Sequence, residues 1–177
     1  IGVDVGGTKI AAGVVDRAGQ VLDQVRVQTP ASTAAAVEAG ICDAVAQLAA
    51  RHEVSAVGLA VAGFVDQSRS VLRFAPNLPM ADRPLRQVVG ACTGLPVVVE
   101  NDANAAAWGE HRFGGGRGAD DVVMITVGTG LGGGIVLGGR LFRGAFGAAA
   151  ELGHTRMVPG GLLCGCGNHG CWEQYSS

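Results

Sequence analysis

The stretch IGVDVGGTKIAAGVV, residues 1–15, decides the fold class, because a glycine turn at residues 6–8 separates two apolar runs. The two runs predict strands over residues 1–5 and 9–15. Residues 21–27 alternate apolar and polar side chains and predict a third strand, reached through a turn at residues 16–19. The chain is therefore expected to open with an antiparallel three-stranded meander.

The rest of the chain alternates helical and strand patterns. Apolar side chains at three- and four-residue steps predict a first helix, which either Ser32 or Thr33 would cap. Short, continuously apolar runs predict buried strands. Helices are expected over residues 34–52, 85–92 and 103–112, strands over 54–62, 96–99, 122–127 and 134–137, a proline-bearing loop over 74–83, and a hairpin turn at Gly138-Gly139. This order predicts an α/β fold.

Composition excludes several classes of protein. Apolar residues make up 48% of the 177 residues and charged residues 16%, so the chain is not disordered. The 30 glycines show no three-residue period, which excludes collagen. The net charge of −2 gives no charge-based reason to expect a nucleic-acid-binding surface. The uncharged stretch 122–139 is too rich in glycine for a membrane span, and no signal peptide is visible, so we expect a cytoplasmic protein.

The first glycine turn has the residue types of a phosphate site. In Asp4-x-Gly6-Gly7-Thr8, glycines let backbone N–H groups approach an anion, and Thr8 adds a hydroxyl donor. Asp4 could hold Mg²⁺ through water. The alternative is a hairpin turn that needs glycine for positive φ, and no Walker motif is present to decide between them.

The second glycine turn, residues 128–134, also lies between two predicted strands. It contains more glycines than a hairpin needs, which favours a second contact with a polyphosphate. The alternative is a crowded hairpin or bulge.

A third candidate site is Glu100-Asn101-Asp102, at the end of a predicted buried strand. Ligands of α/β sheets bind beyond such strand ends, and an aspartate there can accept a proton from a substrate hydroxyl. The alternative is an N-cap for the helix that follows.

Cys164, Cys166 and Cys171 lie within eight residues and follow His154. Three thiolates and one imidazole form a complete tetrahedral set for Zn²⁺, and four protein ligands indicate a structural ion. His169 lies between two of the cysteines and would be cramped as a ligand. The alternative is a disulfide and free cysteines. The odd total of five argues against a secreted disulfide framework, and Cys42 and Cys92 lie far apart in the sequence.

Taken together, these motifs resemble the ROK family (repressor, open reading frame, kinase), and most of all its bacterial ATP-dependent glucokinases. The resemblance rests on the first phosphate motif, the catalytic segment, the second phosphate motif and the zinc signature, which together span nearly the whole chain. The matching stretches are residues 4–9, 100–104, 128–132, 151–154 and 164–173.

The resemblance implies an actin-like, hexokinase-type (ribonuclease H-like) fold with two lobes. The first lobe, residues 1–112, would carry the first phosphate motif and the catalytic aspartate. The second lobe would begin in residues 113–177 with the second phosphate motif and the zinc loop. Members of the family continue further, so the fold is expected to be incomplete at the C-terminus, as in an N-terminal fragment.

The function that the resemblance implies is ATP-dependent phosphorylation of glucose at the 6-hydroxyl, with Asp102 as the base. It also implies structural Zn²⁺, Mg²⁺ with ATP, and a homo-oligomer, either dimer or tetramer. Sugar contacts are expected from Gly63, Asn77, Asn101, Asp102, Glu151, His154 and Glu173, phosphate contacts from Asp4, Gly6, Gly7, Thr8, Lys9, Gly128, Thr129 and Gly130, and zinc ligation from His154, Cys164, Cys166 and Cys171.

Alternative functions stay open on the sequence. One is a kinase of the same family for an N-acetylated amino sugar. Another is a sugar-responsive transcriptional repressor without its DNA-binding part, although retention of Asp102 favours a kinase. A third is a zinc-stabilised sugar-binding domain. The glycine turns also suit polyphosphate as the phosphate donor.

Overall fold

The structure is a computed structural model that describes residues 1–30, 32–128 and 130–177. These residues form two compact units, Ile1–Asp102 and Ala103–Ser177, which are described in turn. The lobe boundary at residues 112/113 that the family resemblance implies stays a prediction. In the second unit, helix α3 (Asp102–Phe113) packs closely on strand β10 (Leu131–Leu137), where a Cβ on Gly134 would collide with the Cβ of Ala107.

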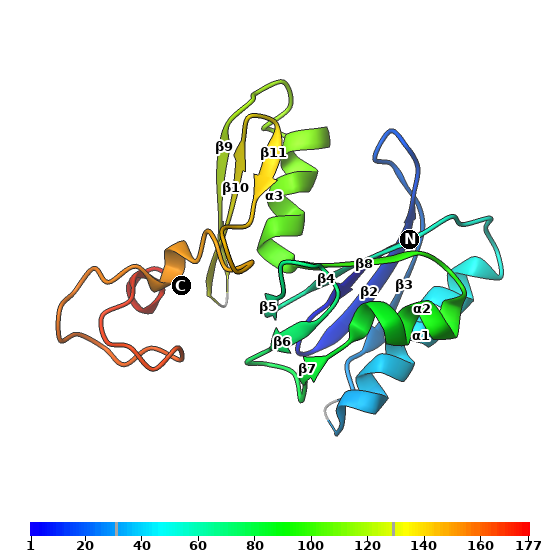
Figure 1. The fold of residues 1–177 in the computed structure, drawn as a ribbon, viewed down its shortest axis with the longest axis horizontal. Coiled ribbons are helices and arrows are strands. Elements are labelled where there is room, and N and C mark those ends of the chain that lie inside the picture. Colours follow the sequence, from blue (N-terminus) through cyan, green and yellow to red (C-terminus); the bar gives the residue numbers. More distant parts are fainter. Residues whose placement is uncertain (31, 129) are drawn as a thin grey trace. The chain divides into compact units, whose positions relative to one another are not determined.

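A five-stranded sheet forms the centre of the first unit, with the order β3-β2-β1-β4-β8 (Figure 1). Its strands are β1 (Gly2–Val5), β2 (Lys9–Val15), β3 (Val21–Gln28), β4 (Val57–Val61) and β8 (Val97–Asn101). The first three are antiparallel, which confirms the predicted meander, whereas β4 is parallel to both β1 and β8. The carboxyl ends of β1, β4 and β8 therefore meet at one edge of the sheet.

Helices α1 (Ala34–Ala49) and α2 (Leu85–Thr93) cover one face of this sheet (Figure 1). Thr33 is the N-cap of α1, because its hydroxyl accepts a hydrogen bond of 3.1 Å from the amide of Ala36. The fully buried side chains of α1 meet those of the strands in a single apolar core. Its largest members are Ile10, Ile41, Leu48, Leu59, Leu72 and Leu85.

A small three-stranded sheet follows β4 and was not predicted. It consists of β5 (Phe64–Val65), β6 (Leu72–Phe74) and β7 (Ala81–Arg83). The sequence indicated a proline-bearing loop over residues 74–83 and gave no prediction for residues 63–73. Strands of two or three residues are too short to show an alternating pattern. Arg83 fastens this sheet to α1 through two hydrogen bonds to the Glu38 carboxylate, at 2.8 and 2.9 Å.

The second unit contains α3 and an antiparallel sheet of β9 (Val122–Val127), β10 and β11 (Arg140–Phe142). Gly138 and Gly139 have φ values of 54° and 71°, which confirms the predicted hairpin between β10 and β11. The other described residues of this unit form loops with two short 3₁₀ helices, η1 (Leu152–His154) and η2 (Trp172–Tyr175). Within the part of the chain that the structure describes, no helix combines the length and apolar character needed to cross a membrane.

Candidate functional site

The first glycine turn joins β1 to β2 and is held from two sides. The amide of Gly6 donates to the carbonyl of Lys9 at 3.0 Å, and the hydroxyl of Thr29 donates to the carbonyl of Gly6 at 2.6 Å. Neither Gly6 nor Gly7 has a positive φ, so the hairpin alternative does not explain them. Gly7 is needed because a Cβ there would lie 2.8 Å from the carbonyl oxygen of Asn77.

Asp4, Thr8 and Lys9 are exposed around this turn. Asn77, which the family resemblance implies as a sugar contact, is also exposed and belongs to the segment between β6 and β7. The close approach of residues 7 and 77 therefore brings the first phosphate motif next to a candidate sugar ligand. This arrangement lies within the first unit, at the carboxyl end of β1.

The carboxyl end of β8 brings together three further predicted residues. The side-chain amide of Asn101 donates to the carbonyl of Gly63 and to Oδ1 of Asp102, both at 3.1 Å. Residue 63 must be glycine for the chain to lie here, since a Cβ would collide with the carbonyl oxygen of Phe74. Asp102 is the first residue of α3, where the helix dipole stabilises its negative charge. Helix-start and proton-acceptor roles are thus compatible.

In the second unit, the glycines of the second turn differ in their surroundings. Gly132 and Gly134 pack against α3, and a Cβ on Gly133 would collide with the carbonyl oxygen of Ala150, so the crowded-hairpin alternative accounts for these three. Gly128 has open space around its Cα, and its amide donates to the carbonyl of Gly130 at 3.0 Å. The predicted phosphate contact Thr129 lies outside the described residues.

His154, Cys164, Cys166 and Cys171 form a candidate metal site, with one donor atom of each within 4.8 Å of all the others. The Sγ atoms of Cys166 and Cys171 are 3.7 Å apart, and Sγ of Cys164 is 3.5 Å from Nδ1 of His154. Tetrahedral Zn²⁺ would separate two sulfur ligands by about 3.8 Å and sulfur from nitrogen by about 3.6 Å. The observed separations fit that geometry.

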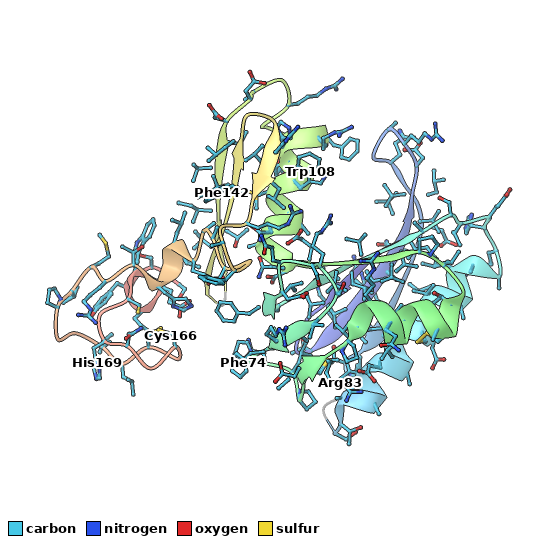
Figure 2. All side chains as sticks on the ribbon, in the orientation of Figure 1. Phe74, Arg83, Trp108, Phe142, Cys166 and His169 are labelled. Carbon is cyan, nitrogen blue, oxygen red and sulfur yellow. A yellow bond between two sulfur atoms is a disulfide. The ribbon has the colours of Figure 1, made fainter. Side chains whose placement is uncertain are left out.

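The loop that carries the cysteines is folded back by glycines. Gly167 and Gly170 have φ values of 87° and 78°, and a Cβ on Gly170 would collide with the carbonyl oxygen of Val158. The amide of Cys164 donates to the carbonyl of Asn168 at 2.8 Å. Cys166 and His169 are labelled in this loop in Figure 2; His169 is exposed and does not belong to the cluster.

The thiols of the cluster differ in acidity. Burial raises the pKa of Cys164 to about 12, whereas a hydrogen bond from the backbone of Asn168 lowers the pKa of Cys166 to about 7. Burial also raises the pKa of Cys171. Without a metal, Cys166 therefore carries the first thiolate, and a bound cation must displace protons from the other two.

Glu173 connects the cysteine cluster to the second glycine turn. Its Oε1 lies 3.0 Å from Sγ of Cys164 and 3.6 Å from Nδ1 of His154, and its Oε2 accepts from the amide of Leu131 at 3.4 Å. The opposite ring nitrogen, Nε2 of His154, lies 3.9 Å from Oε2 of Glu151. Two predicted sugar-binding carboxylates thus flank the imidazole.

Each unit consequently holds part of the predicted site residues. In the first unit, Gly7 approaches Asn77, and Asn101 bonds to Gly63 and Asp102. In the second unit, the metal cluster lies together with Glu151 and Glu173. The bond from Leu131 to Glu173 was not foreseen. Its partners are 42 residues apart, so no local pattern indicates it.

Comparison of the sequence with known proteins gives two findings. The model of the ROK family matches residues 1–177. A glucokinase of Streptomyces coelicolor is 60% identical over 177 residues, which cover all of this chain and 56% of that protein. The chain thus spans about half the length of such relatives.

Solved structures give the same picture. The crystal structure of a ROK family glucokinase from Streptomyces griseus in complex with glucose and AMPPNP has a TM-score of 0.92 and 60% identity, over 99% of this chain and 56% of that one. A ROK hexokinase from Thermus thermophilus has a TM-score of 0.84 and 46% identity, over 97% and 58%. These neighbours support the predicted hexokinase-type fold.

Proposed function

The chain belongs to the ROK family, and from this premise we propose that the protein containing it transfers the γ-phosphate of ATP to the 6-hydroxyl of glucose. The observation that carries the proposal is the arrangement of Gly63, Asn101 and Asp102 at the carboxyl end of a parallel strand pair. Ligands of open α/β sheets bind at this position. Two relatives at 60% identity are glucokinases, which supports glucose as the sugar.

Asp102 is the proposed general base. Its carboxylate would accept the proton of the sugar hydroxyl while that oxygen attacks phosphorus, a role worth about 10²–10⁴-fold in rate. Asn101 orients it, because one amide group donates both to Oδ1 of Asp102 and to the carbonyl of Gly63. The orienting bond thus ties the base to the neighbouring strand end.

The phosphates of ATP are proposed to contact both glycine turns. Gly6, Gly7 and Thr8 offer backbone and hydroxyl donors in the first, and the open surroundings of Gly128 allow close approach in the second. Lys9, Thr129 and Gly130 complete the proposed set. Asp4 would hold the Mg²⁺ that accompanies ATP, and this ion would neutralise charge on the transferred phosphoryl group.

Structural Zn²⁺ is proposed for His154, Cys164, Cys166 and Cys171. Four protein ligands leave no open coordination position, so the ion would stabilise the loop without taking part in the reaction. The donor separations of 3.5 and 3.7 Å support this assignment. By fixing His154, the ion would also hold the adjacent Glu151 and Glu173 in place.

The sugar would be bound by Asn77, Asn101, Glu151, His154 and Glu173, with the backbone near Gly63. Carboxylates suit a polyhydroxyl ligand because they accept hydrogen bonds without competing donors. A homo-oligomeric state, either dimer or tetramer, is carried over with this proposal from the family resemblance. A cytoplasmic location is proposed from the sequence.

The test is ADP release from ATP by the full-length protein with glucose, N-acetylglucosamine, N-acetylmannosamine or no sugar. The proposal predicts release with glucose and little with the acetylated sugars. Release only with an acetylated sugar would keep the reaction type and overturn the substrate. Absence of ADP release with every sugar, in protein shown to bind glucose, would favour a sugar-responsive regulator. A second assay, which measures glucose phosphorylation with polyphosphate in place of ATP, identifies the phosphate donor.

A further inference from the structure

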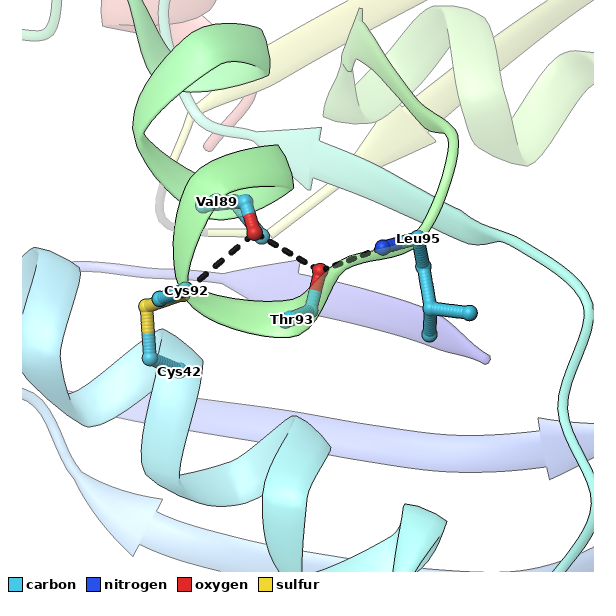
Figure 3. The surroundings of a disulfide bond; sticks show 5 residues. All are labelled: Cys42, Val89, Cys92, Thr93 and Leu95. Atoms are coloured by element: carbon cyan, nitrogen blue, oxygen red, sulfur yellow. Dashed lines mark hydrogen bonds between the residues drawn. A yellow bond between two sulfur atoms is a disulfide. The ribbon is translucent and has the colours of Figure 1, made fainter.

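A disulfide joins Cys42 of α1 to Cys92 of α2 (Figure 3). The two cysteines are 50 residues apart in the sequence, and their Cα atoms are 6.2 Å apart. The sequence pattern gave no sign of this pairing. The other three cysteines are free and belong to the cluster in the second unit, so this pair is chemically separate from the candidate metal site.

We propose that Cys42 and Cys92 form a reversible oxidation site, at which a hydroperoxide converts two thiols into a disulfide that clamps α2 to α1. The proposal is independent of the kinase assignment, because it rests only on the packing of two helices in the first unit.

Helix α2 has few other anchors. It spans only nine residues, and only Leu85 and Val89 among them are fully buried. No side chain caps its N-terminus at Pro84, and Gly90 lies in its interior. Helices of this length are marginal without tertiary support. By contrast, α1 buries six residues over 16, so the disulfide attaches a weakly held helix to a firmly held one.

Both oxidation states fit the same backbone. In the thiol form, Sγ of Cys92 would keep an acceptor, the carbonyl oxygen of Val89 at 3.3 Å (Figure 3). Thr93 also donates to that carbonyl at 2.7 Å and accepts from the amide of Leu95 at 3.3 Å. These local bonds keep the last turn of α2 helical in the thiol form, but they do not attach it to α1. Opening the bond therefore lets the two sulfur atoms separate by side-chain rotation, without unfolding this turn.

The exposure of the two cysteine residues sets the order of reaction. Cys92 is exposed and Cys42 is partly buried, so Cys92 is the thiol that meets an oxidant first. Its thiolate attacks one oxygen of the peroxide, the O–O bond breaks, and sulfenic acid forms with release of water or an alcohol. The Cys42 thiol then attacks this sulfur and releases water. Two electrons pass from the sulfur atoms to the peroxide, and a small dithiol reduces the disulfide back to two thiols.

The clamp acts close to the candidate catalytic strand. The chain turns at Gly94, directly after α2, and enters β8, which ends with Asn101. Fastening the end of α2 therefore restrains the segment that leads to Asn101 and Asp102. We expect oxidation to reduce local opening of α2 and to leave β9, in the other unit, unaffected.

The test is stoichiometric oxidation of the fully reduced, full-length protein with hydrogen peroxide, followed by alkylation and peptide mapping. The proposal predicts that the dominant product is a cross-linked peptide pair containing Cys42 and Cys92, reversed by dithiothreitol. Mapping distinguishes this pair from the other three cysteines. Hydrogen exchange of α2 amides should slow at least about tenfold in the oxidised form.

The matched control is the A91C/C92A variant, which keeps the number of thiols and moves one to a different side of α2. It should form little of the intramolecular cross-link. The oxidation site is overturned if the wild-type protein yields no cross-link between Cys42 and Cys92, or if the control forms it equally well. Equal exchange of α2 amides in both oxidation states would overturn the clamp.

Discussion

Replacing Arg83 by methionine should destabilise the first unit by removing the partner of a buried charge. The carboxylate of Glu38 is only 9% exposed and receives two hydrogen bonds from Arg83, at 2.8 and 2.9 Å. Breaking a buried ion pair from one side costs about 3–5 kcal/mol. The Arg83 side chain is 36% exposed, so water can partly solvate the Glu38 carboxylate once the guanidinium is removed. We therefore expect the free energy of unfolding to fall by about 2–3 kcal/mol.

Equilibrium unfolding in urea and thermal melting measure this effect, and the expected fall in Tm is about 5–10 °C. The matched control is R73M, which breaks the exposed pair with Asp82 and should cost less than about 0.5 kcal/mol. The double variant E38M/R83M should recover at least half of the loss, because an apolar pair can replace a buried ion pair. The reasoning is refuted if R83M costs no more than R73M, or if the double variant is as unstable as R83M.

The remaining predictions concern the metal site and the first glycine turn. C166A should lower bound zinc from one equivalent per chain towards zero by atomic absorption, and unchanged zinc content contradicts the ligand set. Zinc affinity, measured by competition with a chelator, should fall as the pH is lowered, because burial raises the pKa of Cys164 to about 12 and each ligand must lose its proton; equal affinity at pH 6 and pH 8 speaks against this. G7A should cost about 1–3 kcal/mol in urea unfolding, since its Cβ would lie 2.8 Å from the carbonyl oxygen of Asn77. G58A, with nothing within 4 Å, is the control, and equal stability of the two variants would disprove the close contact.

Patterns that repeat along the chain made much of the fold predictable. Alternation and continuous apolar runs identified the meander of β1, β2 and β3 and the buried strands β4 and β8. Strand β9 has the predicted bounds. Strand β10 begins three residues earlier than expected, at Leu131, because glycines carry no side chains from which a period can be recognised.

Features that depend on long-range contact could not be predicted. The strands β5, β6 and β7 are too short for a period, and the pairs Glu38–Arg83 and Cys42–Cys92 join residues 45 and 50 positions apart. Residues of the candidate site were recognised where chemistry is concentrated in a short stretch, as in the cysteine loop. Glu173 lies between Leu131 and Cys164 because of tertiary packing, which the local sequence does not indicate.

The central claim is that Asp102 acts as the base of a sugar kinase, and the kinetics of D102N test it most directly. We predict that kcat for glucose phosphorylation falls by about 10²–10⁴-fold while glucose affinity, measured by calorimetry, stays within a few fold of the wild type. D43N, which makes the same change at an exposed position of α1, should keep full activity. Full activity of D102N would contradict the account, as would loss of glucose binding in proportion to the loss of rate.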